Sequence, residues 1–242
     1  MDNKEISNIF TEGQVLSFNK PLYWTSFDLV NKIRIMLRTT FRLKKIKVGH
    51  AGTLDPLASG VVLICTGKST KRIDEFRDLE KEYVATIYLG QTTPSFDLET
   101  ETEGDFPVGH ITEKLVLEIL DSFKGRQMQM PPSYSAKLIG GKRSYEFARK
   151  GVEKELSPSE IYFHRIELIS FNLPEVTVKL LCSKGTYIRS FARDLGLALG
   201  SGAYLSALER TAIGNFSVKK AFTVESFEEY LKIVSQTPDP GT

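Results

Sequence analysis

Apolar and polar residues alternate with a period of two in several segments of the chain, and this period is typical of β-strands. In residues 83–89 the odd and even positions form two different faces, which predicts a strand. Residues 161–171 and 175–182 predict two more strands. Residues 61–65 are apolar at every position, which indicates a buried strand.

Four other segments predict helices. Residues 26–38 have an apolar face at helical spacing, and Ser26 is the predicted N-cap. The residues of that face are Phe27, Val30, Ile33 and Leu37. Residues 112–123 begin with a capping threonine, and residues 70–76 and 188–199 predict a short and a longer helix.

These elements follow one another without the regular strand–helix alternation of a parallel sheet. We therefore expect an α+β fold in which helices flank a mixed sheet. Residues 125–156 are rich in Pro, Gly, Lys and Tyr and predict a long excursion from that fold. A loop of this length inside a compact domain usually serves a function.

Composition excludes several classes of protein. The 242 residues are 41% hydrophobic and 26% charged, which is ordinary for a globular protein, and no apolar run is long enough to span a bilayer. The N-terminus lacks a signal-peptide pattern, and Cys65 and Cys182 lie in apolar runs. We therefore expect a cytoplasmic protein with buried thiols. The three histidines have no cysteine partners, so we expect no metal site.

Charge is unevenly distributed, although the net charge is only +2. Residues 29–54 contain no Asp or Glu but carry Lys32, Arg34, Arg38, Arg42, Lys44, Lys45 and Lys47. A second basic segment covers residues 137–154, whereas residues 97–105 form an acidic run. This separation indicates a basic face for a polyanion. A solvated helix face explains the same pattern equally well.

The candidate chemistry lies in the segment Gly49-His50-Ala51-Gly52-Thr53-Leu54-Asp55-Pro56-Leu57-Ala58-Ser59-Gly60. Pro56 disfavours the α region for Asp55, so this carboxylate lies on extended backbone beside the strand 61–65. Taken alone, such a loop is most often a structural turn. The same holds for Tyr83, Tyr187 and Arg189, which singly are ordinary half-buried aromatics and an ion-pair partner.

Together these segments resemble the TruB family, the tRNA pseudouridine-55 synthases. The resemblance is carried by the 49–60 segment, Lys81-x-Tyr83, and Ser183-Lys184-Gly185-Thr186-Tyr187-Ile188-Arg189. It also includes Pro132-Ser133-Tyr134-Ser135-Ala136-Lys137-Leu138 and Ala207-Leu208-Glu209-Arg210, and extends over residues 18–223. It implies the pseudouridine-synthase fold, with a mainly antiparallel sheet, and an isomerase that converts uridine 55 of the tRNA T-loop to pseudouridine.

The resemblance also implies roles for individual residues. Asp55 is the expected catalytic carboxylate, either as a nucleophile at C1′ or as a base that removes a sugar proton. Arg189 is expected to keep Asp55 ionised, because an adjacent guanidinium lowers the pKa of a carboxylate. Tyr83 is expected to stack on the flipped base and to assist proton removal from C5. The other expected substrate-binding residues are His50, Tyr187, Leu208 and Lys20. No cofactor and no metal are expected.

The expected partner is tRNA, bound by a monomer through the helix 26–38 and a thumb-like insertion at 125–156. Tyr23 departs from the family pattern, which has glycine there, and we expect it to pack with Trp24. The expected organisation is an N-terminal extension (1–17), a catalytic domain (18–230), and a C-terminal tail (231–242) without a PUA domain.

Two other functions fit the same residues. One is an RNA-binding or RNA-folding protein in which catalysis is secondary. The other is a guide-RNA-dependent enzyme of the dyskerin type, against which the short chain argues. The intact Asp55, Tyr83 and Arg189 favour a tRNA-modifying enzyme.

Overall fold

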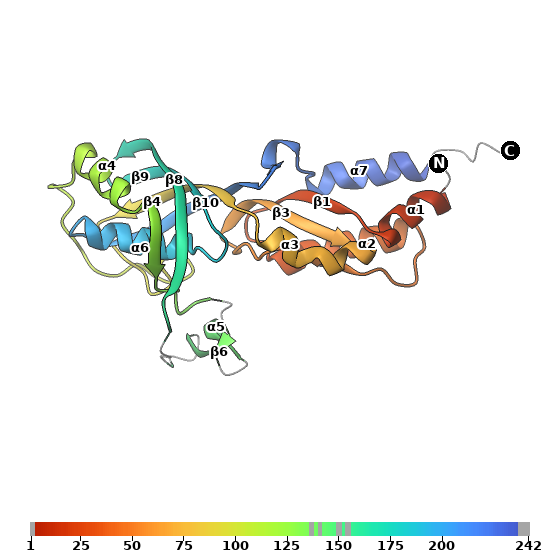
Figure 1. Cartoon of the computed structure of the whole chain (residues 1–242), viewed down its shortest axis with the longest axis horizontal. Coiled ribbons are helices and arrows are strands. Elements are labelled where there is room, and N and C mark those ends of the chain that lie inside the picture. Colours follow the sequence, from red (N-terminus) through yellow and green to blue (C-terminus); the bar gives the residue numbers. More distant parts are fainter. Residues whose placement is uncertain (1–2, 136–137, 140–141, 149–151, 153–155, 237–242) are drawn as a thin grey trace. The chain divides into compact units, whose positions relative to one another are not determined.

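The computed structural model describes residues 3–135, 138–139, 142–148, 152 and 156–236, and its elements are shown in Figure 1. The chain forms two compact units. The first unit contains residues 1–81 and 209–242, and the second contains residues 82–208.

The first unit is built on strand β3 (Ala58–Thr66). Strands β1 (Val15–Lys20) and β2 (Val48–His50) both pair with β3 in antiparallel register, with Phe18 opposite Val62 and His50 opposite Ile64. The end of β10 (Ala203–Ile213) follows β3 in the strand order and carries the short strand β11 (Phe216–Ser217).

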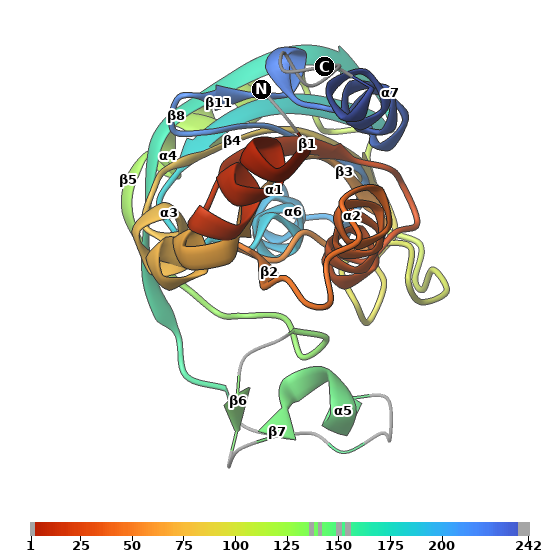
Figure 2. The ribbon, with the colours of Figure 1, turned by 90° about the vertical axis from the view of Figure 1, so that its right-hand side faces the viewer.

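Helices surround these strands, as Figure 2 shows for α1, α2, α3 and α7. The helical elements of the unit are α1 (Asn3–Glu12), α2 (Ser26–Thr40), the 3-10 helix η1 (Gly67–Arg72), α3 (Ile73–Arg77), the 3-10 helix η2 (Val218–Lys220) and α7 (Val224–Ser235). Phe18 on β1 packs edge-on against Phe227 on α7, which also contacts Phe10 on α1. A second cluster joins Val61 and Leu63 to Ile213. Strand β3 is therefore buried on both faces, as the apolar run predicts.

The second unit contains a sheet with the order β10-β4-β9-β8-β5. Besides β10, the strands of this sheet are β4 (Lys81–Leu89), β5 (Gly125–Gln129), β8 (Ser159–Asn172) and β9 (Glu175–Cys182). Its helices are α4 (Glu113–Ser122), α5 (Ser144–Ala148) and α6 (Ile188–Ala198), and a separate two-stranded sheet consists of β6 (Leu138–Ile139) and β7 (Lys142–Arg143). Phe191 on α6 contacts Phe163 on β8 and Phe123 next to α4, so both helices pack on this sheet.

These observations confirm the predicted α+β class and most of the predicted elements. Alternate positions of β4 and β9 are buried as expected. The prediction for residues 26–38 is wrong in two details. Thr25, not Ser26, caps the helix, because the Thr25 side chain and Asp28 form a reciprocal capping box. Phe27 lies in the first turn and is exposed, while Leu29 and Met36 take part in the buried face.

The boundaries also differ from those expected. Residues 125–129 belong to the main sheet as β5, paired with β8, so the excursion begins after Gln129. Part of the excursion lies outside the described residues. Residues of the expected N-terminal extension pack into the first unit, because Ile6 and Phe10 are buried, and β1 already begins at Val15. At the other end, α7 continues to Ser235.

Candidate active site

The loop that carries Asp55 connects β2 to β3 in the first unit. Its central residue Leu54 is held by Ser26, whose hydroxyl accepts a hydrogen bond from the Leu54 N–H at 2.9 Å and donates to the Leu54 carbonyl at 3.1 Å. Ser26 is buried at the start of α2. Asp55 follows directly and is half-buried, and its carbonyl accepts a bond from Ala58 N–H at 3.1 Å. The carboxylate therefore projects from backbone that the helix fixes.

Arg210 supports the same loop from inside the unit. The Arg210 side chain is almost fully buried and donates to three backbone carbonyls, those of Val61 (2.7 Å), Thr53 (3.2 Å) and Gly52 (3.4 Å). Gly60 lies against the backbone of Arg210, and a Cβ there would overlap the Arg210 carbonyl oxygen. Glycine at position 60 is thus required by a close approach of two strands as well as by its φ of +111°.

Lys20 is expected to bind the substrate, but its side chain is buried in the first unit. Its side chain has no exposed surface, and its ammonium donates to the carbonyls of Pro21 (3.0 Å) and Trp24 (2.6 Å). Burial lowers the pKa of the Lys20 ammonium to about 8, and the charge of Asp55 opposes this shift. Lys20 thus places a buried positive charge near Asp55. His50, on β2, is half-buried.

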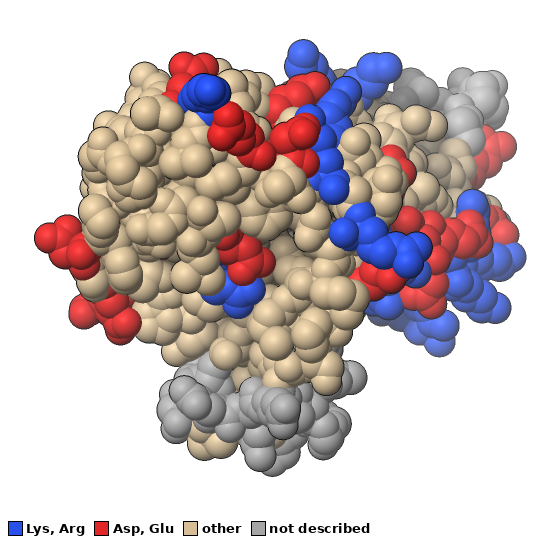
Figure 3. Space-filling model, turned by 60° about the vertical axis from the view of Figure 1, so that its left-hand side comes forward, with Lys and Arg blue, Asp and Glu red and all other residues tan. Residues whose placement is uncertain are grey.

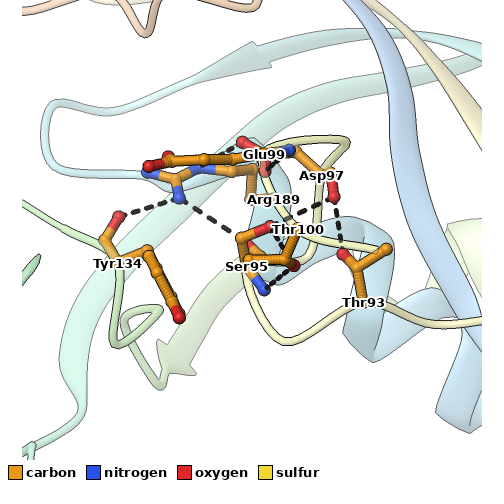
Figure 4. A network of polar contacts seen from close by, with 7 residues as sticks. All are labelled: Thr93, Ser95, Asp97, Glu99, Thr100, Tyr134 and Arg189. Atoms are coloured by element: carbon orange, nitrogen blue, oxygen red, sulfur yellow. Dashed lines mark hydrogen bonds and ion pairs between the residues drawn. The ribbon is translucent and has the colours of Figure 1, made fainter. Parts of the chain in front are cut away.

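Arg189 is the second residue of α6 and is 5% exposed. Figure 4 shows its guanidinium among polar groups of the second unit. Its Nη1 donates to the carbonyls of Tyr134 (2.8 Å) and Ser95 (3.4 Å), and its Nε lies 3.6 Å from the carboxylate of Asp97. Within its own unit Arg189 is thus held by one acid and two backbone carbonyls.

Asp97 is a site residue that the sequence prediction does not include. It belongs to the acidic run, yet it is buried, whereas Glu99, Glu101, Glu103 and Asp105 are exposed. The hydroxyls of Thr93 and Ser95 both donate to the Asp97 carbonyl, at 2.6 and 3.1 Å. Its apolar neighbours Phe96 and Leu98 are the sequence signal that sets it apart from the other acids of the run.

Tyr187 and Arg189 are not on one extended segment, because α6 begins at Ile188. Tyr187 is the extended residue that precedes the helix. Gln129 fixes it, since the Gln129 side chain accepts from Tyr187 N–H at 2.8 Å and donates to its carbonyl at 3.0 Å. The Ser190 hydroxyl donates to the Met130 carbonyl at 2.8 Å. The end of β5 thus positions the start of α6.

The expected site residues are divided between the two units. Asp55, His50 and Lys20 belong to the first unit, and Tyr83, Tyr187, Arg189 and Leu208 to the second. Tyr83 is buried on one face of β4, and its neighbour Glu82 lies on the opposite face. Glu82 pairs with Arg165 (3.0 Å) and Lys179 (3.1 Å) on neighbouring strands. Leu208, on β10, is also buried.

Positive charge is concentrated in one hollow of the first unit. The hollow has a volume of about 350 Å³ and is lined by Thr11, Lys45, Ile46, Lys47, Gly67, Lys68, Thr70 and Lys71. Lys68 pairs with Glu12. On the face in Figure 3, Lys and Arg side chains lie beside Asp and Glu side chains and leave a wide uncharged area. Arg34 on α2 turns to the protein, where it donates to the Val48 carbonyl at 3.0 Å.

Metal-binding and membrane-spanning features are both absent from the described residues. Among them there is no group of three or more His, Cys, Asp or Glu side chains arranged to hold a metal ion. The helices of this part of the chain are too short or too polar for any of them to cross a bilayer.

Two solved structures of protein complexes contain chains that are similar to this one. A chain in the crystal structure of a Cbf5-Nop10-Gar1 complex is 27% identical, with a TM-score of 0.72, and the match covers 98% of this chain and 60% of that one. A chain in the structure of an H/ACA RNP bound to a substrate RNA containing 2'-deoxyuridine is 26% identical, with a TM-score of 0.66 over 94% of this chain and 55% of that one. The fold is therefore that of pseudouridine synthases. The chain spans little more than half the length of these solved chains.

Family models and relatives narrow this class. The N-terminal domain model of the TruB family of pseudouridylate synthases matches residues 38–188, and the model of the tRNA pseudouridylate synthase B C-terminal domain matches residues 189–240. The chain belongs to the TruB family. The tRNA pseudouridine synthase B of Parabacteroides distasonis is 54% identical over 92% of this chain and 95% of its own length. The protein of the same name from Phocaeicola vulgatus is 55% identical over 92% and 94%.

Proposed function

We propose that this chain converts uridine 55 in the T-loop of tRNA into pseudouridine. The observation that carries the proposal is the fixed presentation of Asp55 on the loop between β2 and β3. Ser26 and Arg210 hold the residues that lead to it, which suits a group that must meet one atom of the substrate. Membership of the TruB family and relatives named tRNA pseudouridine synthase B support the choice of reaction.

The reaction breaks the C1′–N1 bond of uridine and joins C1′ to C5, so the product is an isomer of the substrate. C5 loses a proton and N1 gains one, and no oxidant or nucleotide cofactor is consumed. Asp55 supplies the carboxylate, either by attacking C1′ or by removing a sugar proton. Glycoside hydrolases generally use two carboxylates. Here the detached base is retained and reattached, so one carboxylate is sufficient.

Lys20 acts on Asp55 rather than on the RNA in this proposal. Its buried ammonium places positive charge near the carboxylate and ties the chain at Pro21 and Trp24 to strand β1. Arg189 is assigned the same task from the second unit, where Asp97 orients its guanidinium. An ionised Asp55 is needed for either of the two routes.

The remaining residues are assigned to the flipped uridine. Tyr83 stacks on the base and assists the loss of the C5 proton, and Tyr187 and Leu208 line the pocket. His50 fills the gap that the extruded base leaves. These roles come from the family pattern, and the rigid setting of Tyr187 by Gln129 supports a fixed pocket wall.

The RNA backbone is gripped by cationic side chains in this proposal. Lys32 and Arg38 on α2 are exposed, while Arg34 is engaged with Val48. The hollow lined by four lysines adds a concentrated positive site that suits phosphates. The thumb-like residues after Gln129 supply a further grip. We place the protein in the cytoplasm, because Cys65 and Cys182 are buried free thiols and burial raises the pKa of Cys65 to about 11. We propose that it acts as a monomer.

Measurement of pseudouridine in a tRNA transcript tests the proposal. The wild-type protein should form one pseudouridine, at position 55, without added cofactor or partner. Asp55→Asn should form none, while the exposed carboxylate variant Asp105→Asn should match wild type. RNA binding without any product from wild type would instead assign the protein to RNA folding. Activity that requires a guide RNA would assign it to the dyskerin type.

A further inference from the structure

Tyr23 has a backbone conformation that tyrosine rarely adopts. Its φ is +67°, in the left-handed region, where the Cβ crowds the following carbonyl and glycine is favoured. The conformation is fixed by a hydrogen bond from the Tyr23 N–H to the Pro56 carbonyl at 2.7 Å. Tyr23 is therefore a strained residue whose backbone is joined to the residue directly after Asp55.

The side chain of Tyr23 is not part of the protein core. The residue is 75% exposed, and two further apolar residues beside it in the sequence, Leu22 and Phe27, are 44% and 60% exposed. Single exposed apolar residues are common on protein surfaces, whereas these three lie within six positions of the sequence, and we call them the patch. The strain at Tyr23 thus holds an aromatic ring in solvent rather than in the core.

The patch lies beside the candidate catalytic group. Tyr23 binds Pro56 directly, and the carbonyl of the next residue, Trp24, accepts a bond from the Lys20 ammonium, whose charge interacts with Asp55. Two connections therefore tie the patch to Asp55 within the first unit. This places the patch within reach of a substrate that is larger than one nucleotide and has its reacting atom at Asp55.

We propose that Leu22, Tyr23 and Phe27 form a second stacking site, which takes a nucleobase of the substrate RNA other than the target uridine. The inference rests on the proposed function. Extrusion of a uridine leaves neighbouring loop bases unstacked, and such bases bind to exposed aromatic rings without regard to sequence. Three side chains supply far less area than a stable protein–protein interface, which buries about 800 Å² on each partner, but enough for one base.

Two substitutions at Tyr23 separate stacking from backbone strain. Tyr23→Gly and Tyr23→Asn both tolerate positive φ but lack the ring, so neither should lower the melting temperature. Both should raise the KM for tRNA about 5- to 150-fold, the range expected for one stacked base, with kcat unchanged at saturation. Tyr23→Phe keeps the ring and should keep KM within about twofold of wild type. Ile233→Ala removes a comparably exposed apolar side chain, 69% exposed on α7, and is the matched control.

Each outcome decides the question. A wild-type KM in both the Gly and Asn variants would overturn the stacking site, and so would an equal loss in the Phe variant. The proposed function would survive either result, because wild type would still form pseudouridine. If wild type forms none, the proposed function fails first. If only the Gly variant has a lower melting temperature, the KM of the Asn variant for tRNA decides between a stacking site and none.

Discussion

The Nε of Arg210 donates to the carbonyl of Val61 at 2.7 Å, although the two residues are 149 positions apart in the chain. The same guanidinium reaches Thr53 and Gly52, so one side chain from β10 fixes both the loop before Asp55 and the strand after it. A planar fork with several donors is suited to this task.

Arg210→Lys should therefore damage the protein although it keeps the charge. A single ammonium cannot reach all three carbonyls, and each buried acceptor left unsatisfied costs about 1–3 kcal/mol. We expect the free energy of unfolding to fall by about 3 kcal/mol in urea denaturation, and kcat to fall more than KM rises. Arg77→Lys, on the exposed face of α3, should change neither. Equal effects of the two variants would contradict a special role for Arg210.

Gly60→Ala and Gly52→Ala form a matched pair. Both glycines have positive φ, +111° and +98°, so alanine strains either backbone by about 1–2 kcal/mol. Only at Gly60 does the added Cβ overlap the Arg210 backbone, because no atom lies within 4 Å at Gly52. Gly60→Ala should lose about 1–3 kcal/mol more than Gly52→Ala in unfolding free energy. Equal losses in thermal denaturation would show that the strands separate easily.

The pH dependence of activity should report on Lys20. With a pKa of about 8, Lys20 loses its charge as the pH rises through 8, and the positive charge that it places near Asp55 is then lost. We expect kcat/KM to decline above pH 8 in wild type, and Lys20→Met to show low activity without that decline. The same alkaline limb in the Met variant would assign it to another group.

The effect of Lys20 on stability has the opposite sign. Between pH 8 and 10.5 the unfolded chain still holds the Lys20 proton while the folded chain has released it, so the unfolding free energy rises with pH in this window. Below pH 8 both states are protonated and the buried charge destabilises the fold. The melting temperature of Lys20→Met minus that of wild type should therefore fall between about pH 7.5 and about pH 10, because only wild type gains stability from this group.

Asp97→Asn should weaken the fold and the activity together. It removes the acid that faces the buried Arg189, and an uncompensated buried charge costs about 3–5 kcal/mol. We expect a loss near the lower end of this range, because the Arg189 Nε and the Asp97 carboxylate are 3.6 Å apart and the ion pair is therefore not tight. Urea denaturation measures this effect. Glu101→Gln changes an exposed acid of the same run and should be neutral. A neutral Asp97→Asn would mean that the two carbonyls alone hold Arg189.

The lysine-lined hollow should contribute to the salt dependence of tRNA affinity. Binding of tRNA should weaken steeply with salt, and the double substitution Lys45→Gln and Lys71→Gln should reduce the slope of log Kd against log salt by about one for each phosphate that the variant no longer neutralises. Lys114→Gln on α4 is the control, because Lys114 faces Glu118 on the same helix. An unchanged slope in the double variant would exclude the hollow from the RNA interface.

Periodicity predicts the long elements because burial of one face decides their pattern. Strand β4 and helix α6 follow their predicted ranges within two residues. Periodicity does not reveal the short strand β5, since Gly125–Gln129 is mostly polar and is recognisable only by its pairing with β8. Helical spacing places Phe27 in the core, but Phe27 is 60% exposed while Ser26 and Leu29 in the same turn are buried.

The candidate site is predicted unevenly for a similar reason. Asp55 stands in a recognisable segment, so the sequence alone identifies its loop. Asp97 and Arg210 receive no role from the sequence, because their partners are distant in the chain. Asp97 faces Arg189, and Arg210 donates to Val61. Lysine is usually a surface residue. Only the structure shows that Lys20 is buried and that it donates to the carbonyls of Pro21 and Trp24.

The anchoring of Leu54 by Ser26 and of Thr53 by Arg210 has a consequence for the catalytic cycle. The carboxylate of Asp55 is preorganised, because the backbone on which it stands is already bonded to α2 and β10 before any RNA arrives. Little reorganisation of this loop has to precede the reaction. The motion that limits turnover is therefore expected in the RNA, which must extrude a base, and not in the loop that receives it.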